Sequence, residues 1–191
     1  MNFCFNHPLI GDIIINAEMR LTILLRSILD GDDFMKICTV SFFGHRQIDN
    51  ALIIEQRLEA IIRELLTTKE YVEFLIGRNG EFDLLVASTI HRCKQNVRDD
   101  NSALILILPY TTAEYTDNQQ SFHAYYDEIE VCSKSEKSHF KSAYRVRNCS
   151  MVDRSNLVIF CVERNSGGAY QTMQYAKRAG INIINLPELT N

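Results

Sequence analysis

The sequence lacks the features of a membrane or secreted protein. None of its apolar runs approaches the roughly 20 residues that are needed to span a bilayer. The amino-terminal residues have neither the basic flank nor the small-residue cleavage site of a secretory signal. We therefore expect a cytoplasmic protein without a membrane partner.

The sequence also lacks an excess of positive charge. Its formal net charge is −4 over 191 residues. A nucleic-acid backbone is usually bound by a basic face, so this balance argues against nucleic acid as a partner. It is compatible with a local basic pocket for a small anion. The apolar content of 46% is enough for the core of one globular domain.

Metal-ligand patterns are missing as well. The six cysteines and five histidines are scattered, with no CxxC and no Cys/His pair at metal-ligand spacing. Several cysteines, such as Cys38 and Cys161, lie in apolar runs, which is typical of reduced cysteines in a core. We predict no metal site and no cofactor.

From residue 37 onward, short apolar runs alternate with segments of helical periodicity. The runs predict strands over 37–43, 71–76, 103–108, 157–162 and 181–186, and the periodic segments predict helices over 50–66, 82–96, 145–155 and 167–179. Such alternation predicts an α/β fold of three layers, with a mostly parallel central sheet between helices.

Two segments depart from this alternation. Residues 1–34 are interpreted as an amino-terminal extension, either dispensable or produced by a start upstream of Met35, ahead of a domain over 35–191. The alternative is a packing or dimer helix over 18–29, which leaves a homo-oligomer open. Residues 110–142 are polar and rich in tyrosine, and we predict an irregular insertion that borders the site.

Polar and glycine-rich clusters follow the predicted strands. Ligands bind outside the carboxyl ends of parallel strands, where the strand order reverses, so we expect these clusters to meet at one edge. The candidate ligand-binding residues are Gly44, His45, Arg46, Gly80, Glu81, Asp83, Arg147, Asn148, Gly167, Gly168 and Thr172.

The residue types in these clusters suit an anion such as phosphate. Arg46 offers a forked, permanently charged donor, and Gly167-Gly168 at a helix start exposes backbone N–H groups. His45 could donate to an anion or exchange a proton, and Glu81 and Asp83 could accept from ribose hydroxyls.

Each cluster also has a plainer interpretation. Gly44-His45-Arg46 is then a polar turn, Gly167-Gly168 an ordinary loop, and residues 81–83 a helix cap with Phe82 in the core. Arg147 is then a surface ion pair of little energetic value. The joint placement after strands favours a shared pocket.

Four motifs in this order resemble the SLOG superfamily. They are Phe43-Gly44-His45-Arg46, Gly77-Arg78-Asn79-Gly80-Glu81-Phe82-Asp83, Arg147-Asn148 with Met151, and Gly167-Gly168-Ala169, spread over about Lys36 to Leu186. Within the superfamily they are similar to the small bacterial YpsA-like branch with FGHR and GEFD motifs. The resemblance implies a Rossmann-like fold that binds a nucleotide or nucleotide-derived ligand, often as a sensor.

The superfamily also includes the LOG phosphoribohydrolases and the DNA-processing DprA proteins. The resemblance places Gln174 where the LOG enzymes carry a catalytic glutamate, and glutamine cannot ionise. We therefore predict a ligand-binding, sensor-like protein and leave open whether it is an enzyme.

Two other functions compete with this one. The rival is a nucleotide N-glycosidase with a rearranged active site, in which Glu81 or Asp83 supplies the carboxylate and His45 donates a proton. Interaction with DNA or with another protein, by analogy with DprA, is a third class. The net charge of −4 argues against the DNA part of it.

Overall fold

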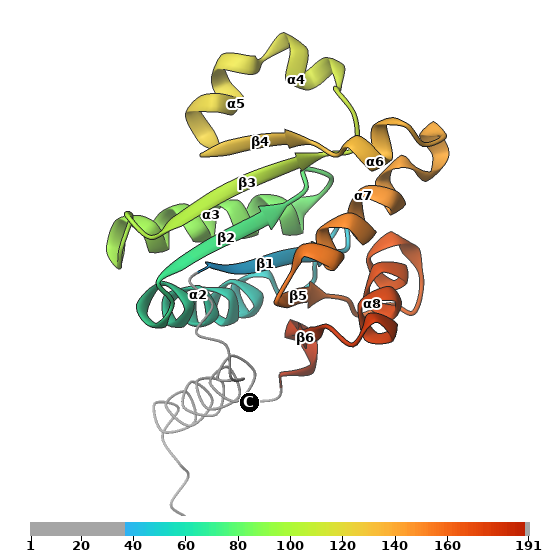
Figure 1. The fold of residues 1–191 in the computed structure, drawn as a ribbon. Helices are drawn as coiled ribbons and strands as arrows, with labels where there is room; N and C mark the ends of the chain where they lie inside the picture. Colours follow the sequence, from blue (N-terminus) through green and yellow to red (C-terminus); the bar gives the residue numbers. More distant parts are fainter. Residues whose placement is uncertain (1–36, 190–191) are drawn as a thin grey trace, which may run out of the picture.

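The computed structural model describes residues 37–189 (Figure 1). The predictions for residues 1–34, including the helix over 18–29, lie outside these described residues, and so does Met35. No helix within residues 37–189 combines the length and the apolar character that crossing a membrane requires.

One sheet of six parallel strands forms the centre of the fold (Figure 1). The strands are β1 (Ile37–Gly44), β2 (Tyr71–Ile76), β3 (Ser102–Leu108), β4 (Glu128–Val131), β5 (Leu157–Cys161) and β6 (Asn182–Asn185). Their order is β4-β3-β2-β1-β5-β6, and every pairing is parallel. The predicted α/β fold with three layers is therefore confirmed.

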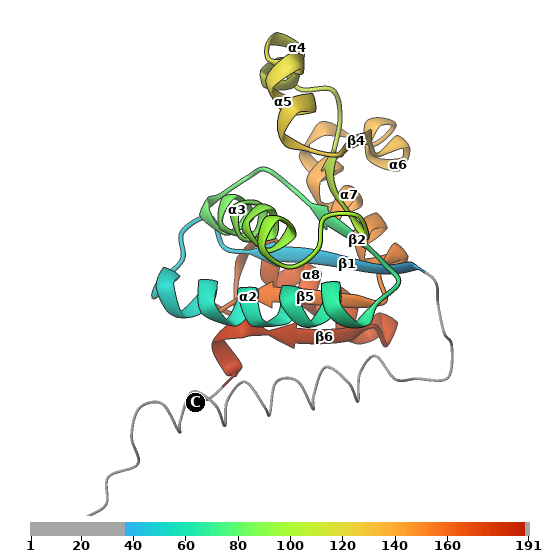
Figure 2. The same cartoon turned by 90° about the vertical axis from the view of Figure 1, so that its left-hand side faces the viewer.

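Long helices cover both faces of the sheet (Figure 2). Two of them, α2 (Ala51–Thr68) and α3 (Glu81–Asn96), lie on one face, and α7 (Phe140–Arg154) and α8 (Gly167–Ala179) lie on the other. Each face has its own hydrophobic core, and the sheet separates the two.

The sequence pattern explains how β1 and α2 contribute to these cores. Phe42 points into the core under α2 and α3, and the next residue, Phe43, points into the core under α7 and α8. This is the alternation of a strand that is buried on both faces. In α2, Ile54, Leu58 and Ile61 are fully or almost fully buried at helical spacing, so one side of the helix packs on the sheet.

The strand order reverses between β1 and β5. The chain runs outward from β1 through β2 and β3 to β4, then crosses back and places β5 on the other side of β1. The carboxyl ends of β1 and β5 are therefore the reversal point at which open α/β sheets bind ligands.

The segment 110–142 is not the irregular insertion that we predicted. It contains α4 (Ala113–Asp117), α5 (Gln119–Tyr125), the edge strand β4 and α6 (Ser133–Glu136), seen at the top of Figure 1. The prediction missed β4 because the strand has four residues and lacks a fully buried side chain, so no apolar run marks it.

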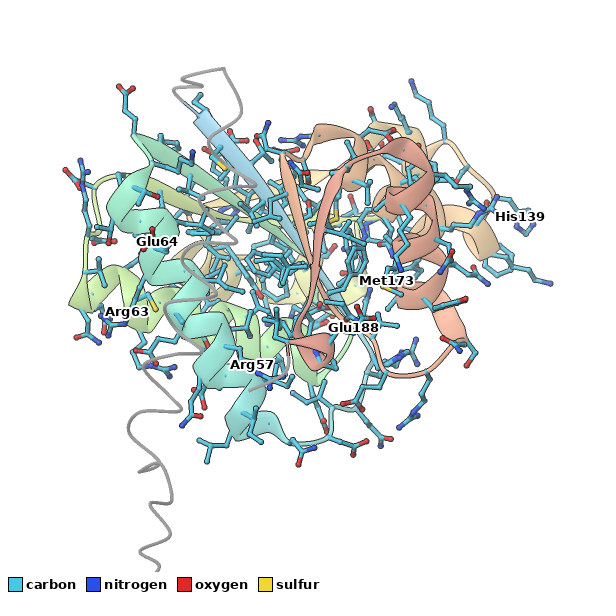
Figure 3. All side chains as sticks on the ribbon, turned by 90° about the horizontal axis from the view of Figure 1, so that it is seen from below. Arg57, Arg63, Glu64, His139, Met173 and Glu188 are labelled. Atoms are coloured by element: carbon cyan, nitrogen blue, oxygen red, sulfur yellow. The ribbon has the colours of Figure 1, made fainter. Side chains whose placement is uncertain are left out.

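Two element boundaries also differ from the prediction. Helix α7 begins at Phe140 rather than at residue 145, because its first turn is mostly exposed and so lacks the apolar periodicity that marks a helix. The last strand ends at Asn185, and a short 3₁₀ helix, η1 (Leu186–Glu188), follows it. Nη1 of Arg57 on α2 donates to the Leu186 carbonyl at 2.7 Å, so η1 lies against α2 (Figure 3).

The side chain of Asn185 joins the end of β6 to the residue after β5. Its Oδ1 accepts from the Val162 N–H at 3.0 Å, and its Nδ2 donates to the Val162 carbonyl at 2.9 Å and to Glu188 at 2.8 Å. Asn185 is buried, so water cannot replace these bonds. It fixes the chain where it leaves the sheet toward α8.

We expect Asn185→Ala to lower the free energy of unfolding by about 1–3 kcal/mol, because it leaves buried backbone groups of Val162 unpaired. Urea denaturation followed by circular dichroism would measure the change. Asn96→Ala, at the exposed end of α3, is the matched control and should change stability by no more than about 0.5 kcal/mol. Equal losses in both variants would contradict the proposed role of Asn185.

Candidate functional site at the carboxyl edge of the sheet

The end of β1 packs directly on the start of α3. A Cβ on Gly44 would lie 2.4 Å from Cγ of Phe82, a residue that is 1% exposed. A Cβ on Gly80 would lie 2.5 Å from Cα of Arg46. Any larger residue at either position would force the two turns apart, because real side chains do not approach so closely. Two of the predicted clusters are therefore neighbours.

The same two turns are joined by hydrogen bonds through Glu81. The Glu81 N–H donates to the Arg46 carbonyl at 2.9 Å, and Oε2 of Glu81 accepts from the Ile48 N–H at 3.2 Å. The first N–H of α3 is thus satisfied by the β1–α2 turn. Arg46 itself is an exposed residue beside this contact.

His45 connects the end of β1 to the loop that precedes α8. Its backbone N–H donates to the Cys161 carbonyl at 3.3 Å, and its Nε2 accepts from the Arg164 N–H at 3.2 Å. Because Nε2 accepts, the neutral ring carries its proton on Nδ1, and only Nδ1 can donate to a ligand. This contact joins the first predicted cluster to the loop that leads into the fourth.

Arg147 is buried, so the interpretation as a surface ion pair is wrong. The residue is 3% exposed, and its Nη1 donates to the Ile107 carbonyl at 3.2 Å. With the Asn79 amide turned so that its oxygen faces the guanidinium, Nη2 donates to it at 2.8 Å. Gly77 makes room for this group, since a Cβ there would lie 2.5 Å from Nη1. Within the described residues, Nε has no partner.

Asp83 lies beside this buried guanidinium. Its Oδ2 accepts from the Asn79 N–H at 2.7 Å, which closes the turn between β2 and α3. Burial raises the pKa of the Asp83 carboxyl, while the Asn79 hydrogen bond and the charge of Arg147 oppose that rise. Asp83 is thus a neighbour of Arg147 rather than a free acceptor at the surface.

The start of α8 is open. Gly167 has φ 89°, a backbone conformation that favours glycine. Apart from the adjacent residues and the backbone of α8 itself, no heavy atom would lie within 4 Å of a Cβ on Gly167 or Gly168. Ser166 occupies the N-cap position, but its side chain accepts no capping hydrogen bond. The space beside both glycines is therefore open, and it lies at the positive end of the helix dipole.

Asn148 and Thr172 hold α8 against α7. Nδ2 of Asn148 donates to Oγ1 of Thr172 at 3.1 Å, and that hydroxyl donates to the Gly168 carbonyl at 2.8 Å. Thr172 is 4% exposed, so both of its hydroxyl bonds are within the protein. These two predicted residues therefore fix the start of α8 relative to α7.

The predicted residues thus form a row of pairwise contacts along the carboxyl edge. Two tyrosines near this row were not among the predicted residues: Tyr110, just after β3, and Tyr144, on α7. Their rings meet edge-to-face at 6.1 Å, and Tyr144 is 40% exposed. The tyrosine-rich composition of residues 110–142 was a signal for Tyr110 but not for Tyr144, which lies outside that segment.

A separate cavity of about 140 Å³ lies beside the carboxyl end of β4. Cys132, Ser150 and Met151 are among the residues that line it. Burial by itself would raise the pKa of the Cys132 thiol, but hydrogen bonds from Ser135, Ser150 and the Lys134 N–H outweigh it and lower that pKa. Residues 37–189 contain no group of three or more His, Cys, Asp or Glu side chains arranged to hold a metal ion.

Comparison with known proteins places the fold in a class. Neither a protein-family model nor a curated protein matches the sequence. Among solved structures, the fold is similar to that of DNA processing protein A. This likeness is one of fold, and it agrees with the Rossmann-like fold that was expected.

Two particular structures match over most of this chain. DNA processing protein A from Helicobacter pylori matches with a TM-score of 0.55 and 14% identity, over 82% of this chain and 66% of that one. The protein from Streptococcus pneumoniae matches with a TM-score of 0.55 and 13% identity, over 79% of this chain and 50% of that one. The chain thus spans about half to two thirds of these proteins.

The prediction that argued against nucleic acid as a partner is wrong. The Helicobacter protein, which shares this fold, binds single-stranded DNA. The prediction relied on the net charge of −4, which is a sum over the whole chain. Contacts to a phosphate backbone depend on where charges and N–H groups lie, so a mildly acidic total does not exclude them.

We predict that iodoacetamide at pH 8 alkylates Cys132 faster than Cys149. Both residues are half-buried, but the pKa of Cys132 is lowered and that of Cys149 is raised, mainly by burial. A lower pKa gives more thiolate at a given pH, and the thiolate is the nucleophile. Mass spectrometry of tryptic peptides would give both rates.

Ser150→Ala provides the control for this prediction. It removes one hydrogen bond to the Cys132 sulfur and should slow the alkylation of Cys132 while that of Cys149 stays the same. Faster alkylation of Cys149 than of Cys132 in the unchanged protein would contradict the assignment.

We also predict that Gly80→Ala lowers the free energy of unfolding by about 1–3 kcal/mol, the usual cost of overpacking. The new methyl group would meet the backbone of Arg46, which cannot move without shifting the β1–α2 turn. Gly168→Ala is the matched control: its Cβ meets open space in the first turn of α8, so its stability should be unchanged or slightly higher. A lower urea midpoint for Gly168→Ala than for Gly80→Ala would contradict the overpacking of Gly80→Ala.

Proposed function

We propose that this protein binds a nucleotide or nucleotide-derived ligand as a sensor or regulatory module of the YpsA-like type. The phosphate would lie between the start of α8 and the end of β1, at the reversal point of the sheet. One observation carries the proposal: the first turn of α8 is uncapped although Ser166, a residue type that caps helices well, occupies the N-cap position.

The uncapped turn is suited to an anion. Its N–H groups and the helix dipole favour negative charge, and Gly167 and Gly168 leave the approach free of side chains. The neighbouring turn contributes Arg46, whose backbone is fixed by Gly80 and Glu81. A guanidinium on a fixed backbone can bond two phosphate oxygens at once.

The contacts between the motifs support the assignment to the YpsA-like branch. The FGHR turn and the GEFD segment pack on each other through Gly44 and Phe82 and through Arg46 and Glu81. The two motifs therefore act as one structural unit, which gives a physical reason for their occurrence together in one sequence.

The nucleotide bound could be free or part of a strand. The Helicobacter neighbour binds single-stranded DNA, and a strand and a mononucleotide share the phosphate and the base that this edge would recognise. We therefore include single-stranded DNA among the ligands to be tested.

The alternative, a nucleotide N-glycosidase, is not favoured by the geometry. Its carboxylate would have to come from Glu81 or Asp83, because residue 174 is a glutamine. Both carboxylates accept backbone N–H groups that close turns, and Asp83 also faces Arg147. His45 uses Nε2 as an acceptor from Arg164, so it would have to donate through Nδ1.

We expect Arg46→Ala to weaken binding of nucleoside monophosphates by about tenfold, the loss of one charge-assisted contact. Isothermal titration calorimetry with the four ribonucleoside 5′-monophosphates and with a short single-stranded DNA would measure it. Raising the salt concentration should weaken binding by the unchanged protein more than by the variant, because exposed charges are screened.

Arg63→Ala is the control for Arg46→Ala. Arg63 pairs with Glu59 on the outer side of α2, away from the carboxyl edge. It should leave every affinity unchanged. The proposal fails if the unchanged protein binds none of these ligands, or if the two arginine variants behave alike.

A further inference from the structure

Tyr144 is an aromatic side chain that the fold leaves exposed beside the proposed phosphate position. It is 40% exposed on α7. Asn148 follows it by four residues, one helical turn, and contacts Thr172 of α8. Residues four apart lie on the same face of a helix, about 6 Å apart along its axis. Tyr144 therefore lies on the face of α7 that meets the start of α8.

The ring of Tyr144 is held in place by two neighbours. Tyr110 meets it edge-to-face, with the ring centroids 6.1 Å apart and the planes at 77°. The guanidinium carbon of Arg147 lies 5.9 Å from its centroid, and that residue is buried and bonded to the end of β3. A ring fixed in this way loses little freedom when a ligand stacks on its exposed part.

Two arginines lie near this ring. Burial and the neighbouring Tyr110 hydroxyl raise the pKa of the Tyr144 phenol, while the charges of Arg147 and Arg46 oppose the rise. Arg46, the residue proposed to bind phosphate, therefore acts on the Tyr144 side chain as well. An exposed aromatic face beside a phosphate-binding cation is the combination that binds a nucleobase together with its phosphate.

We propose that Tyr144 is a specificity-determining residue that stacks on the base of the bound nucleotide, so that the site selects ligands with an aromatic base over sugar phosphates. This inference rests on the proposed nucleotide-binding function. The phosphate would lie at the start of α8 and near Arg46, and the base would stack on the exposed part of the Tyr144 ring.

Phe140 is the other exposed aromatic residue on this helix, and it fits the role less well. It is 68% exposed, but it lies one turn farther from Asn148, and its ring neighbours are His139 and Lys141. None of these contacts connects it to Arg46 or to α8. It therefore offers a matched control for the removal of an aromatic ring from α7.

The experiment compares ligands with and without a base. Isothermal titration calorimetry would measure the affinity for the four ribonucleoside 5′-monophosphates and for ribose 5-phosphate. The proteins compared are the unchanged protein and the variants Tyr144→Ala, Tyr144→Phe, Phe140→Ala and Arg46→Ala. Tyr144→Ala should weaken the tightest nucleotide by about fivefold or more, the loss of one stacked base. It should change the affinity for ribose 5-phosphate by less than about twofold.

The other variants separate stacking from other effects. Tyr144→Phe keeps the ring and should bind nucleotides within about twofold of the unchanged protein, and Phe140→Ala should behave likewise. Arg46→Ala should weaken both ligand classes. Urea denaturation of each variant would show that it is folded at the temperature of the titration.

Three results would overturn the inference. If Tyr144→Ala weakens nucleotides and ribose 5-phosphate equally, the residue supports the phosphate site and does not read the base. If it changes neither while Arg46→Ala weakens both, the proposed function stands and the role of Tyr144 is refuted. If the unchanged protein binds none of the ligands, the proposed function fails and the inference fails with it.

Discussion

The carboxyl edge depends on the close packing of the turn after β1 against the turn before α3. Gly44 meets the ring of Phe82, and Gly80 meets the backbone of Arg46 at a distance that leaves no room for a side chain. The Glu81 N–H then bonds the Arg46 carbonyl. This contact satisfies the start of α3 and at the same time fixes the backbone that carries Arg46. The position of the exposed Arg46 residue therefore depends on the close packing of the two turns beneath it.

Most of the fold could be predicted because its signals are local and strong. The two-sided burial of β1 and the helical spacing of Ile54, Leu58 and Ile61 are visible in the sequence. Strand β4 could not be predicted, since it is a short edge strand whose place is set by pairing with β3 rather than by its own apolar content. The early start of α7 was missed for a related reason, because its first turn has few apolar residues to bury.

The sequence predicted that these clusters lie along one edge of the sheet, but not which contacts each residue makes there. Strand order reversal and post-strand glycines locate the edge, and neither depends on side-chain contacts. The contacts themselves decide which polar groups remain free. Glu81 and Asp83 accept backbone N–H groups, and the buried Arg147 donates to the Ile107 carbonyl, so these three predicted ligand residues also bond within the protein. Sequence spacing cannot separate a polar group that binds the protein's own backbone from one that faces a ligand.

The starts of the helices differ in how their first N–H groups are satisfied. At α4, Thr112 accepts the N–H of Tyr115, and at α7 the His139 ring accepts that of Lys141. The start of α3 is satisfied by the β1–α2 turn. Helices α2 and α5 have an asparagine in the N-cap position and α8 has a serine, and none of these three side chains makes a capping hydrogen bond. At α8 the unused cap coincides with two glycines that leave the helix start open. A cap there would stabilise the helix by about 1 kcal/mol, so leaving it unused is a local cost at the reversal point of the sheet. In the proposed function, a bound phosphate would supply the acceptor that the Ser166 side chain does not.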